Sequence, residues 1–443
     1  MRLAVRRSAG QIDWEPTGFH TDQHHRRTDQ NMPSVVIVGA GAIGLSAAYH
    51  LSRSGCEVTV IDPAPLAAKA SGHNAGWLIP SMSTPVPAPG MMGQALRWIM
   101  KRDSPLYVTP SLDPRFVDFM LRMLRSCTHR RFREGSATLS KLSADALAAF
   151  DELIADGVRF EMHEQPLTML FTDPHKVEAR VNDLELLDGK LPGFSWRHMN
   201  PADLRKHLPA LSDKVVAGIE SEGDRTVDPT SFVHGLADAC RKEGVELNLG
   251  SSASLVDTGR GVVVRVDGET IRADKIVVAA GAWSNRVLAG IGERVPLVSG
   301  KGYGYDYPVG FGGPTKPFYL AEAKVAITPL DTKIRLAGTM GFTEIDERIG
   351  FTRAQGILGG VNDYFAGWPE VADAPEPWTG LRPMSPDGIP YVGPLLRHPQ
   401  VLLATGHVML GISLAPVTGR LIADLVMGRT RAESIPKLLP SRF

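Results

Sequence analysis

The hydrophobic positions of this chain form two patterns. Unbroken apolar runs at residues 35–38 and 276–278 are typical of strands buried on both faces of a parallel sheet. A helical pattern follows the first run at residues 45–53, and a second strand pattern follows at residues 57–61. The apolar run at 401–404 leads in the same way to a helical pattern over about 415–427. These segments predict a doubly wound α/β domain.

Other segments alternate between apolar and polar residues, which is typical of half-buried strands. Residues 262–266 and 270–272 predict a hairpin around Asp267-Gly268, and residues 301–307, 324–328 and 334–339 predict further strands. Segments 138–156, 229–244 and 353–365 have the periodicity of helices. The alternating segments 301–307, 324–328 and 334–339 predict a second, α+β body built on an antiparallel sheet.

A glycine turn joins the first strand to its helix. Gly39, Gly41 and Gly44 have the spacing G-x-G-x-x-G, with Ala42 and Ile43 in the turn, and the second strand ends at Asp62. Such glycines permit the tight turn, a close approach of backbone to a pyrophosphate, and close packing of helix on strand. A carboxylate at the end of the second strand binds ribose hydroxyls. The unit predicts a dinucleotide site, the alternative being an ordinary glycine turn.

This unit alone does not distinguish NAD from FAD. A second strand–turn–helix occurs at residues 401–427, with the glycine turn Thr405-Gly406-His407 and Gly411, which suits the far end of a longer cofactor. An NAD-dependent dehydrogenase with one Rossmann unit leaves this second turn unexplained. A flavin-bearing structural subunit without turnover is the third class considered.

The overall composition excludes several classes. The 48 basic and 48 acidic residues cancel, which argues against a nucleic-acid partner. Cys56, Cys127 and Cys240 are scattered, have no metal-ligand spacing and suit a reducing compartment. We therefore expect no metal site. No apolar run approaches the roughly 20 residues that span a bilayer.

Two regions bear on localisation. Residues 1–31 are polar and arginine-rich without an apolar core, so we expect a disordered extension rather than a secretory signal. Segments 96–102 and 116–125 predict helices that combine apolar bulk with basic residues, including Trp98 and Phe119. We expect a cytoplasmic protein with peripheral contact at the inner face of the membrane. The alternative is that both helices pack on the core.

These motifs, in this order, resemble the D-amino-acid oxidase-like superfamily of FAD-dependent amine oxidoreductases, and within it the D-amino acid dehydrogenases. The resemblance extends over about residues 33–430. Besides the two glycine turns, it rests on segments 71–76, 85–90, 279–284, 301–303 and 378–390.

The resemblance implies a discontinuous Rossmann-like FAD-binding domain with an inserted substrate domain. The expected FAD-binding domain consists of residues 32–95, 215–295 and 378–443, and the expected substrate domain consists of residues 96–214 and 296–377. It also implies noncovalent FAD, since no cysteine falls in a flavin-attachment motif. The residues it assigns to FAD are Gly39, Gly41, Ala42, Ile43, Gly44, Asp62, Ser71, Asn74, Ala75, Gly76, Gly281, Trp283, Gly406, His407 and Gly411.

The resemblance also implies the chemistry. Arg382 matches the arginine that pairs with the substrate carboxylate, and Tyr303 matches an aromatic residue lining the substrate site. A guanidinium suits a carboxylate because it offers a fork of donors. The alternative interpretation of Arg382 is an arginine at the domain interface. The alternative interpretation of Tyr303 is an aromatic residue of the core. Tyr305 and Tyr307 lie on the same side of the strand and compete with it for the role.

The expected reaction is oxidation of free D-amino acids, with hydride moving from Cα to flavin N5 and electrons passing to a quinone or dye. The alternative is an oxidase or dehydrogenase of glycine, sarcosine or D-proline and hydroxyproline.

Overall fold

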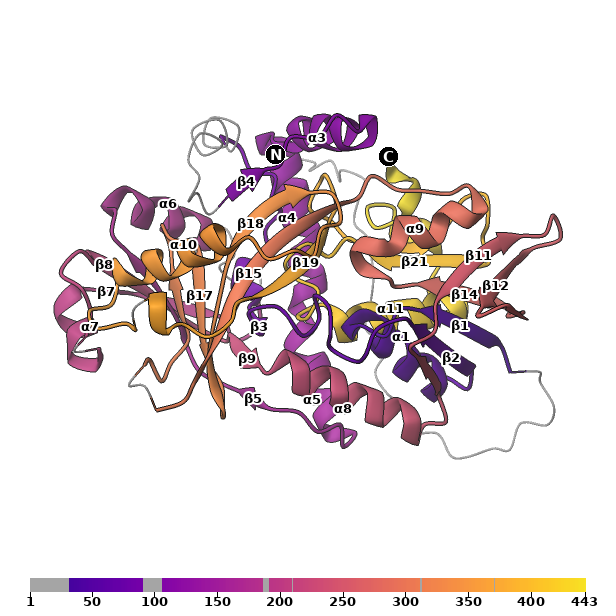
Figure 1. Cartoon of the computed structure of the whole chain (residues 1–443), viewed down its shortest axis with the longest axis horizontal. Coiled ribbons are helices and arrows are strands. Elements are labelled where there is room, and N and C mark those ends of the chain that lie inside the picture. Colours follow the sequence, from indigo (N-terminus) through magenta and orange to yellow (C-terminus); the bar gives the residue numbers. More distant parts are fainter. Residues whose placement is uncertain (1–31, 91–105, 186–190, 209, 311–312, 370) are drawn as a thin grey trace, which may run out of the picture.

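The computed structural model describes residues 32–90, 106–185, 191–208, 210–310, 313–369 and 371–443. Two sheets dominate the two halves of the molecule (Figure 1). The expected extension 1–31 and the expected helix around Trp98 lie outside the described residues.

The first sheet is six-stranded, in the order β10-β2-β1-β14-β21-β20. All neighbours pair in parallel except β20, which is antiparallel to β21. Its core strands are continuous apolar runs, as the pattern predicted. Its strands are β1 (Ser34–Val38), β2 (Glu57–Asp62), β10 (Glu246–Leu249), β14 (Lys275–Val278), β20 (Tyr391–Pro394) and β21 (Val401–Thr405).

Three helices form one layer against this sheet. Helix α1 (Ala42–Arg53) packs between α8 (Pro229–Lys242) and α11 (Ala415–Val426). Gly419 permits the close contact of α11, because a Cβ there would stand 2.4 Å from the backbone carbon of Ser46. Helix α8 begins as the sequence predicted, with Asp228 accepting from the Thr230 amide and Pro229 in the first turn.

The other side of the sheet carries the predicted hairpin. Strands β11 (Ala253–Asp257), β12 (Val262–Val266) and β13 (Glu269–Ile271) form a three-stranded antiparallel sheet, followed by the short α9 (Ser284–Leu288). Apolar residues of β12 and α9 share a core with β1 and β14. The Rossmann-like layers are therefore covered on both faces.

The second sheet is nine-stranded and mostly antiparallel, in the order β19-β15-β18-β17-β16-β6-β8-β7, with β4 beside β18. It confirms the antiparallel body that the alternating segments predicted. Its strands are β4 (Leu106–Val108), β6 (Leu167–Phe171), β7 (Ser195–Met199), β8 (Ala217–Glu222), β15 (Val298–Pro308), β16 (Phe318–Leu320), β17 (Val325–Pro329), β18 (Lys333–Thr343) and β19 (Trp378–Met384).

The two faces of the nine-stranded sheet have different covers. Helix α10 (Phe351–Asn362) packs on one face over Tyr303, Tyr305 and Tyr307. The opposite face meets the loop 72–77, where Arg335 donates to the carbonyls of Gly72 and Asn74. Helix α6 (Pro174–Glu185) packs at the outer end of the sheet, beside β6 and β8 (Figure 1).

The remaining elements link the two halves. Strands β3 (Trp77–Leu78), β9 (Arg225–Val227) and β5 (Met162–His163) form a small sheet. Strands β8 and β19 belong to the nine-stranded sheet, although the expected division put residues 215–222 and 378–384 with the FAD-binding domain. The division into domains is not otherwise tested and stays a prediction. The other helices are α3 (Pro114–Ser126), α4 (His129–Ala144), α5 (Ala146–Ala155) and α7 (Pro201–His207).

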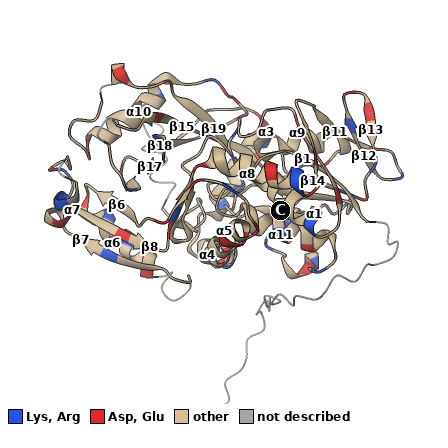
Figure 2. Ribbon diagram, turned by 90° about the horizontal axis from the view of Figure 1, so that it is seen from below, with Lys and Arg blue, Asp and Glu red and all other residues tan. Residues whose placement is uncertain are grey.

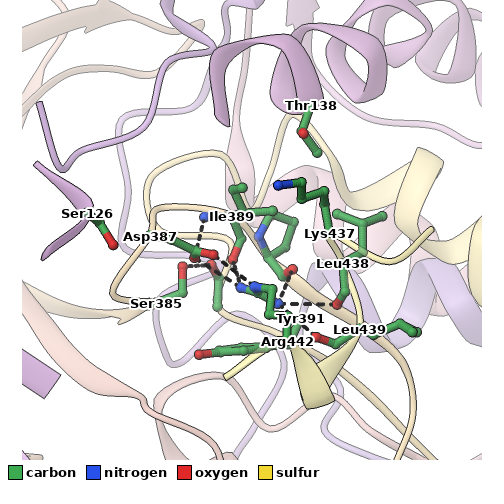
Figure 3. Close-up of polar contacts among 12 residues, drawn as sticks. Ser126, Thr138, Ser385, Asp387, Ile389, Tyr391, Lys437, Leu438, Leu439 and Arg442 are labelled. Carbon is green, nitrogen blue, oxygen red and sulfur yellow. Dashed lines mark hydrogen bonds and ion pairs between the residues drawn. The ribbon is translucent and has the colours of Figure 1, made fainter. Parts of the chain in front are cut away.

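The C-terminal segment is fastened to the turn that follows β19 (Figure 3). Arg442 makes a two-pronged ion pair with Asp387, at 2.8 and 3.1 Å, and donates to the carbonyls of Ile389 and Pro390. Its guanidinium also lies 3.9 Å from the ring centroid of Tyr391. The last residues thereby brace the strand pair β20–β21.

Charge is spread over the whole molecule. Lys and Arg are interspersed with Asp and Glu across both halves (Figure 2). Within the described residues, no helix has the length and apolar character needed to cross a membrane.

Candidate active site

A cleft of about 480 Å³ opens at the carboxyl ends of β1, β2 and β14. This edge of a parallel sheet, where the strand order reverses, is where such folds bind ligands. Its lining contains six residues that the sequence assigned to FAD: Gly39, Gly41, Asp62, Ser71, Gly281 and Trp283. The structure therefore brings together side chains that are more than 200 positions apart in the chain.

The glycines of the first turn are required by close backbone contacts. Gly39 has φ +119°, and a Cβ there would stand 2.5 Å from the carbonyl oxygen of Ala279. A Cβ on Gly44 would stand 1.8 Å from the Gly39 oxygen. Gly41 is the N-cap residue of α1 and makes no side-chain hydrogen bond to the helix. Because glycine has no Cβ, the space in front of Ser71 stays open. This arrangement leaves the helix N-terminus accessible to an anion.

Asp62 is held in place on the wall of the cleft. One carboxylate oxygen accepts from the Ala40 amide at 2.7 Å and the other from the Ala64 amide at 2.8 Å. Ser71 is fixed as well, since its Oγ accepts from the Ala42 amide at 3.0 Å. The volume, the uncapped helix and the terminal acid fit the ADP half of FAD.

The segment after Ser71 is rigid and lies between the two sheets. Asn74 donates to the carbonyls of Ala70 and Ser71 and accepts from the Gly76 amide. The carbonyl of Ala75 accepts from Thr328 on β17 at 2.7 Å. Asn74, Ala75 and Gly76 do not line the cleft of the glycine turn. They connect it to the face of the nine-stranded sheet.

The second glycine turn lies beside the Gly281 turn, because β21 pairs with β14. Thr405 Oγ1 donates to the Gly281 carbonyl at 2.9 Å, and Gly406 has φ +76°. His407 is 2% exposed, with its Nε2 3.0 Å from Thr418 Oγ1. Burial lowers the pKa of His407 to about 3, so the ring is neutral at physiological pH. A contact of His407 or Gly411 with flavin stays a prediction.

Arg382 and the following Pro383 lie in β19, an edge strand of the nine-stranded sheet, beside β15. An edge strand tolerates that proline because it needs one fewer backbone donor. The guanidinium crosses over Gly302, and Nη1 donates to the Thr339 carbonyl at 3.1 Å. Burial lowers the pKa of Arg382 to about 10, which leaves it charged at neutral pH.

Arg382 has no carboxylate partner among the residues that the structure describes. A half-buried guanidinium without an anion is costly, so its place favours a ligand carboxylate. Thr339 beside it is in the left-handed region at φ +60°, and its buried Oγ1 also has no partner. The Thr339 hydroxyl and the remaining N–H groups of Arg382 are donors without a partner among the described residues.

Tyr303 is on the other face of the sheet from Arg382. Gly300 pairs with Arg382 and Tyr303 with Thr379, so strand alternation places the two side chains on opposite sides. Tyr303 is 2% exposed, hydrogen-bonds Tyr107 and packs under α10. Tyr305 and Tyr307 are on the same side, as expected. The structure does not bring Tyr303 to Arg382, and its role in lining the substrate site stays a prediction.

Tyr319 is a residue that the sequence reasoning missed. Tyr319 on β16 pairs with Ala326 on β17, which pairs with Ala337 on β18. Ala337 pairs with Gly304 on β15, and Gly304 with Trp378 on β19. Tyr319 therefore lies on the same sheet face as Arg382. Its ring packs edge-on against Trp77 at 5.6 Å, and burial raises its pKa to about 12. The hydroxyl has no hydrogen-bond partner among the described residues. A strand of three residues carries no pattern that could have marked it.

Two further clusters join the halves of the molecule. Lys69 lies 5.3 Å over the Trp283 ring and pairs with Glu347 at 2.6 Å, beside the cleft. Glu161, His163 and Asp331 offer ligand atoms within 4.8 Å of one another, a grouping that spacing could not reveal. Glu161 Oε1 already accepts from the Asp331 amide.

The fold and the cleft define a flavin-dependent oxidoreductase. Residues 34–425 match the family described as FAD dependent oxidoreductase, and the chain belongs to this family. The cofactor is FAD. Noncovalent binding of FAD stays a prediction.

Relatives carry more specific names. A D-amino acid dehydrogenase of Cereibacter sphaeroides is 34% identical over 404 residues, covering 89% of this chain and 92% of the relative. One of Methylobacterium radiotolerans is 34% identical, covering 89% and 96%.

The fold is shared with solved flavoenzymes at lower identity. Glycine oxidase of Geobacillus kaustophilus matches with a TM-score of 0.70 at 20% identity, covering 93% of this chain and all of that one. Iminodiacetate oxidase of Chelativorans matches with a TM-score of 0.70 at 22% identity, covering 92% and 98%.

Proposed function

We propose that this protein oxidises free D-amino acids to 2-oxo acids, with Arg382 holding the substrate carboxylate. The observation that carries the proposal is a half-buried arginine without an ion pair, on the sheet face that meets the loop leading from the FAD cleft. The naming of the relatives at 34% identity supports the D-amino acid as substrate.

The cofactor site in this proposal consists of the two glycine turns and the loop between the sheets. Gly39, Gly41 and the first turn of α1 hold the pyrophosphate, and Asp62 holds the ribose. When bound, FAD supplies the acceptor for a hydride from the substrate Cα and then releases two electrons to a quinone or dye.

The residues around Arg382 orient the substrate. The forked guanidinium fixes the carboxylate plane, and Trp77 and Trp378 limit the directions in which the rest of the molecule extends. Orientation of this kind supplies much of the rate of a reaction between two bound groups. The amine loses a proton from nitrogen as Cα loses its hydride, and water hydrolyses the resulting imino acid to ammonium and the 2-oxo acid.

We propose a quinone as the acceptor and α3 as the surface that reaches the membrane. Phe119 faces the core at 1% exposure, contrary to the expected aromatic contact. The outer face of α3 instead presents Leu121 and Val117, 47% and 44% exposed, beside Arg125. Helix α3 lies at the periphery of the molecule (Figure 1), as an interfacial helix must.

The test is a panel of D- and L-amino acids, glycine, sarcosine and D-proline, assayed with a dye acceptor and with oxygen. We expect D-amino acids to be oxidised with the dye and only slow peroxide formation. A preference for glycine, sarcosine or D-proline would show that the alternative substrate class is correct. Rapid peroxide production would show that the protein is an oxidase.

A further inference from the structure

A second arginine without an ion pair lies near the candidate substrate site. Arg180 is on α6, and its Nη2 donates to the carbonyl of Ser81 at 3.2 Å. Its Nε is buried and has no hydrogen-bond partner. Among the described residues, no ion pair includes Arg180. Like Arg382, it is a positive group that forms no ion pair within the described part of the chain.

Two carboxyl groups, Asp183 and Asp224, lie near Arg180 but form no ion pair with it among the described residues. Asp224 Oδ2 accepts from the hydroxyls of Ser81 and Ser221, at 2.9 and 2.7 Å. Burial raises the pKa of Asp224 to about 6 and that of Asp183 above its usual range. Burial also lowers the pKa of Arg180, which these two carboxyl groups only partly offset.

Helix α6, which carries Arg180, packs in one apolar cluster with Tyr319. Met82, next to Ser81, packs in the same apolar clusters as Tyr319. Arg382 reaches over Gly302 on the sheet face that carries Tyr319. Burial has the larger effect and raises the pKa of the Tyr319 hydroxyl, whereas the positive charges of Arg180 and Arg382 both lower it. Lys324, in the exposed turn after β16, adds a third cation 5.7 Å from the Tyr319 ring.

We propose that Arg180 binds a second carboxylate of the substrate, so that the preferred substrates are dicarboxylic, such as D-glutamate or D-aspartate. This inference rests on the proposed function. Arg382 holds the α-carboxylate, Tyr319 lies between the two anions, and Arg180 receives the side-chain carboxylate. Two separate unpaired arginines suit one ligand with two anionic ends, because each buried cation then gains a charge-assisted partner.

The alternative is that Arg180 only anchors the turn at Ser81. An anchoring role would affect all substrates alike, whereas a specificity role distinguishes substrates that differ only at the distal end. D-Glutamate and D-glutamine form such a pair, since they share shape and differ in one charge.

The experiment compares kcat/KM for D-glutamate, D-aspartate, D-glutamine and D-alanine, with a dye acceptor, in wild type and Arg180→Gln. The control is Lys176→Gln, which removes an exposed charge from the same helix. We expect wild type to prefer an acidic substrate to D-glutamine by at least about tenfold. Arg180→Gln should lower kcat/KM for the acidic substrate by about 30-fold or more, since loss of a buried charged partner costs about 2–5 kcal/mol. D-Glutamine and D-alanine should change less than about threefold.

Two results would overturn the inference. One is a wild-type protein with a higher kcat/KM for D-glutamine or D-alanine than for the acidic substrates. The other is an Arg180→Gln variant in which kcat/KM falls equally for all substrates. Binding of glutarate against butyrate, followed by perturbation of the flavin absorbance, separates this failure from that of the proposed function. Glutarate should bind more tightly than butyrate only while Arg180 is present. If no D-amino acid is oxidised but this binding difference remains, the proposed reaction fails and the second anion site stands. If the difference is absent, the second anion site is refuted whatever the reaction.

Discussion

The guanidinium of Arg382 occupies the space that a side chain at Gly302 would need. A Cβ built on Gly302 stands 2.2 Å from Arg382 Nη1 and 2.8 Å from Cζ. The arginine therefore lies flat across the strand β15, and the glycine beneath it determines where it can point. Neighbouring Gly300 and Gly304 similarly accommodate Met384 and Trp378.

Gly302→Ala should displace the guanidinium without unfolding the strand, because the clash is with the end of a flexible side chain. We expect kcat/KM for a D-amino acid to fall by about 100-fold, the typical cost of a displacement near 1 Å. The control is Gly359→Ala in α10, where nothing lies within 4 Å of the new Cβ. Full activity in the Gly302 variant would show that the position of Arg382 does not matter.

Arg382→Ala should remove the anchor of the substrate carboxylate. Loss of one member of a desolvated charge pair costs about 2–5 kcal/mol, which corresponds to a fall in kcat/KM of roughly 30-fold to several thousand-fold. Arg382→Lys should restore only part of kcat/KM, because the ammonium group is a point charge and lacks the two parallel donors of the guanidinium. A carboxylate-free amine should be oxidised at nearly the wild-type rate. An equal loss on both substrates, or loss of FAD, would make Arg382 structural.

Gly41→Val should give a protein with little bound FAD. The new side chain would stand about 3.0 Å from Ser71 Oγ at its Cβ and project where the pyrophosphate approaches. The measurement is the ratio of flavin to protein absorbance after purification, with Gly359→Ala again as control. A normal flavin content would contradict the placement of FAD in this cleft.

Arg442→Ala should destabilise the protein without touching the substrate site. The pair with Asp387 is largely shielded, with side chains 9% and 18% exposed, so its loss should cost about 3–5 kcal/mol. Arg429→Ala is the matched control, because that arginine is 54% exposed in its pair with Asp424 and should cost at most about 1 kcal/mol. Thermal unfolding with FAD bound measures both. Equal midpoints in the two variants would show that the C-terminal clamp contributes nothing.

Binding to anionic vesicles at low salt should depend on the outer face of α3. Leu121→Ser should weaken flotation with the vesicles, since it removes apolar area that would enter the lipid interface. Phe351→Ser is the control, an equally solvent-facing apolar residue on α10. Wild-type protein that stays in solution at low salt would refute the membrane contact.

Much of the FAD-binding half was determined by local sequence. The apolar runs, the glycine spacing and Asp62 predict a strand, turn and helix, because each of these residues meets a requirement of the local backbone. Gly44 cannot carry a Cβ against the Gly39 carbonyl, and Asp62 ends its strand beside the Ala40 amide. The predicted helix at 229–244 and the hairpin around Asp267-Gly268 also formed, the helix beginning after its Asp228 cap.

The substrate side was decided by tertiary structure. Tyr303 and Arg382 were grouped by motif, but side chains alternate along a strand, and the β15–β19 register puts them on opposite faces. Tyr319 and Arg180 carry no local signal, since one sits in a three-residue strand and the other on a polar helix. Strand pairing and the packing of α6 bring them near Arg382. Periodicity acts over neighbouring residues, whereas sheet register and helix packing join segments that the chain leaves far apart, so only the folded molecule shows which charges face one another.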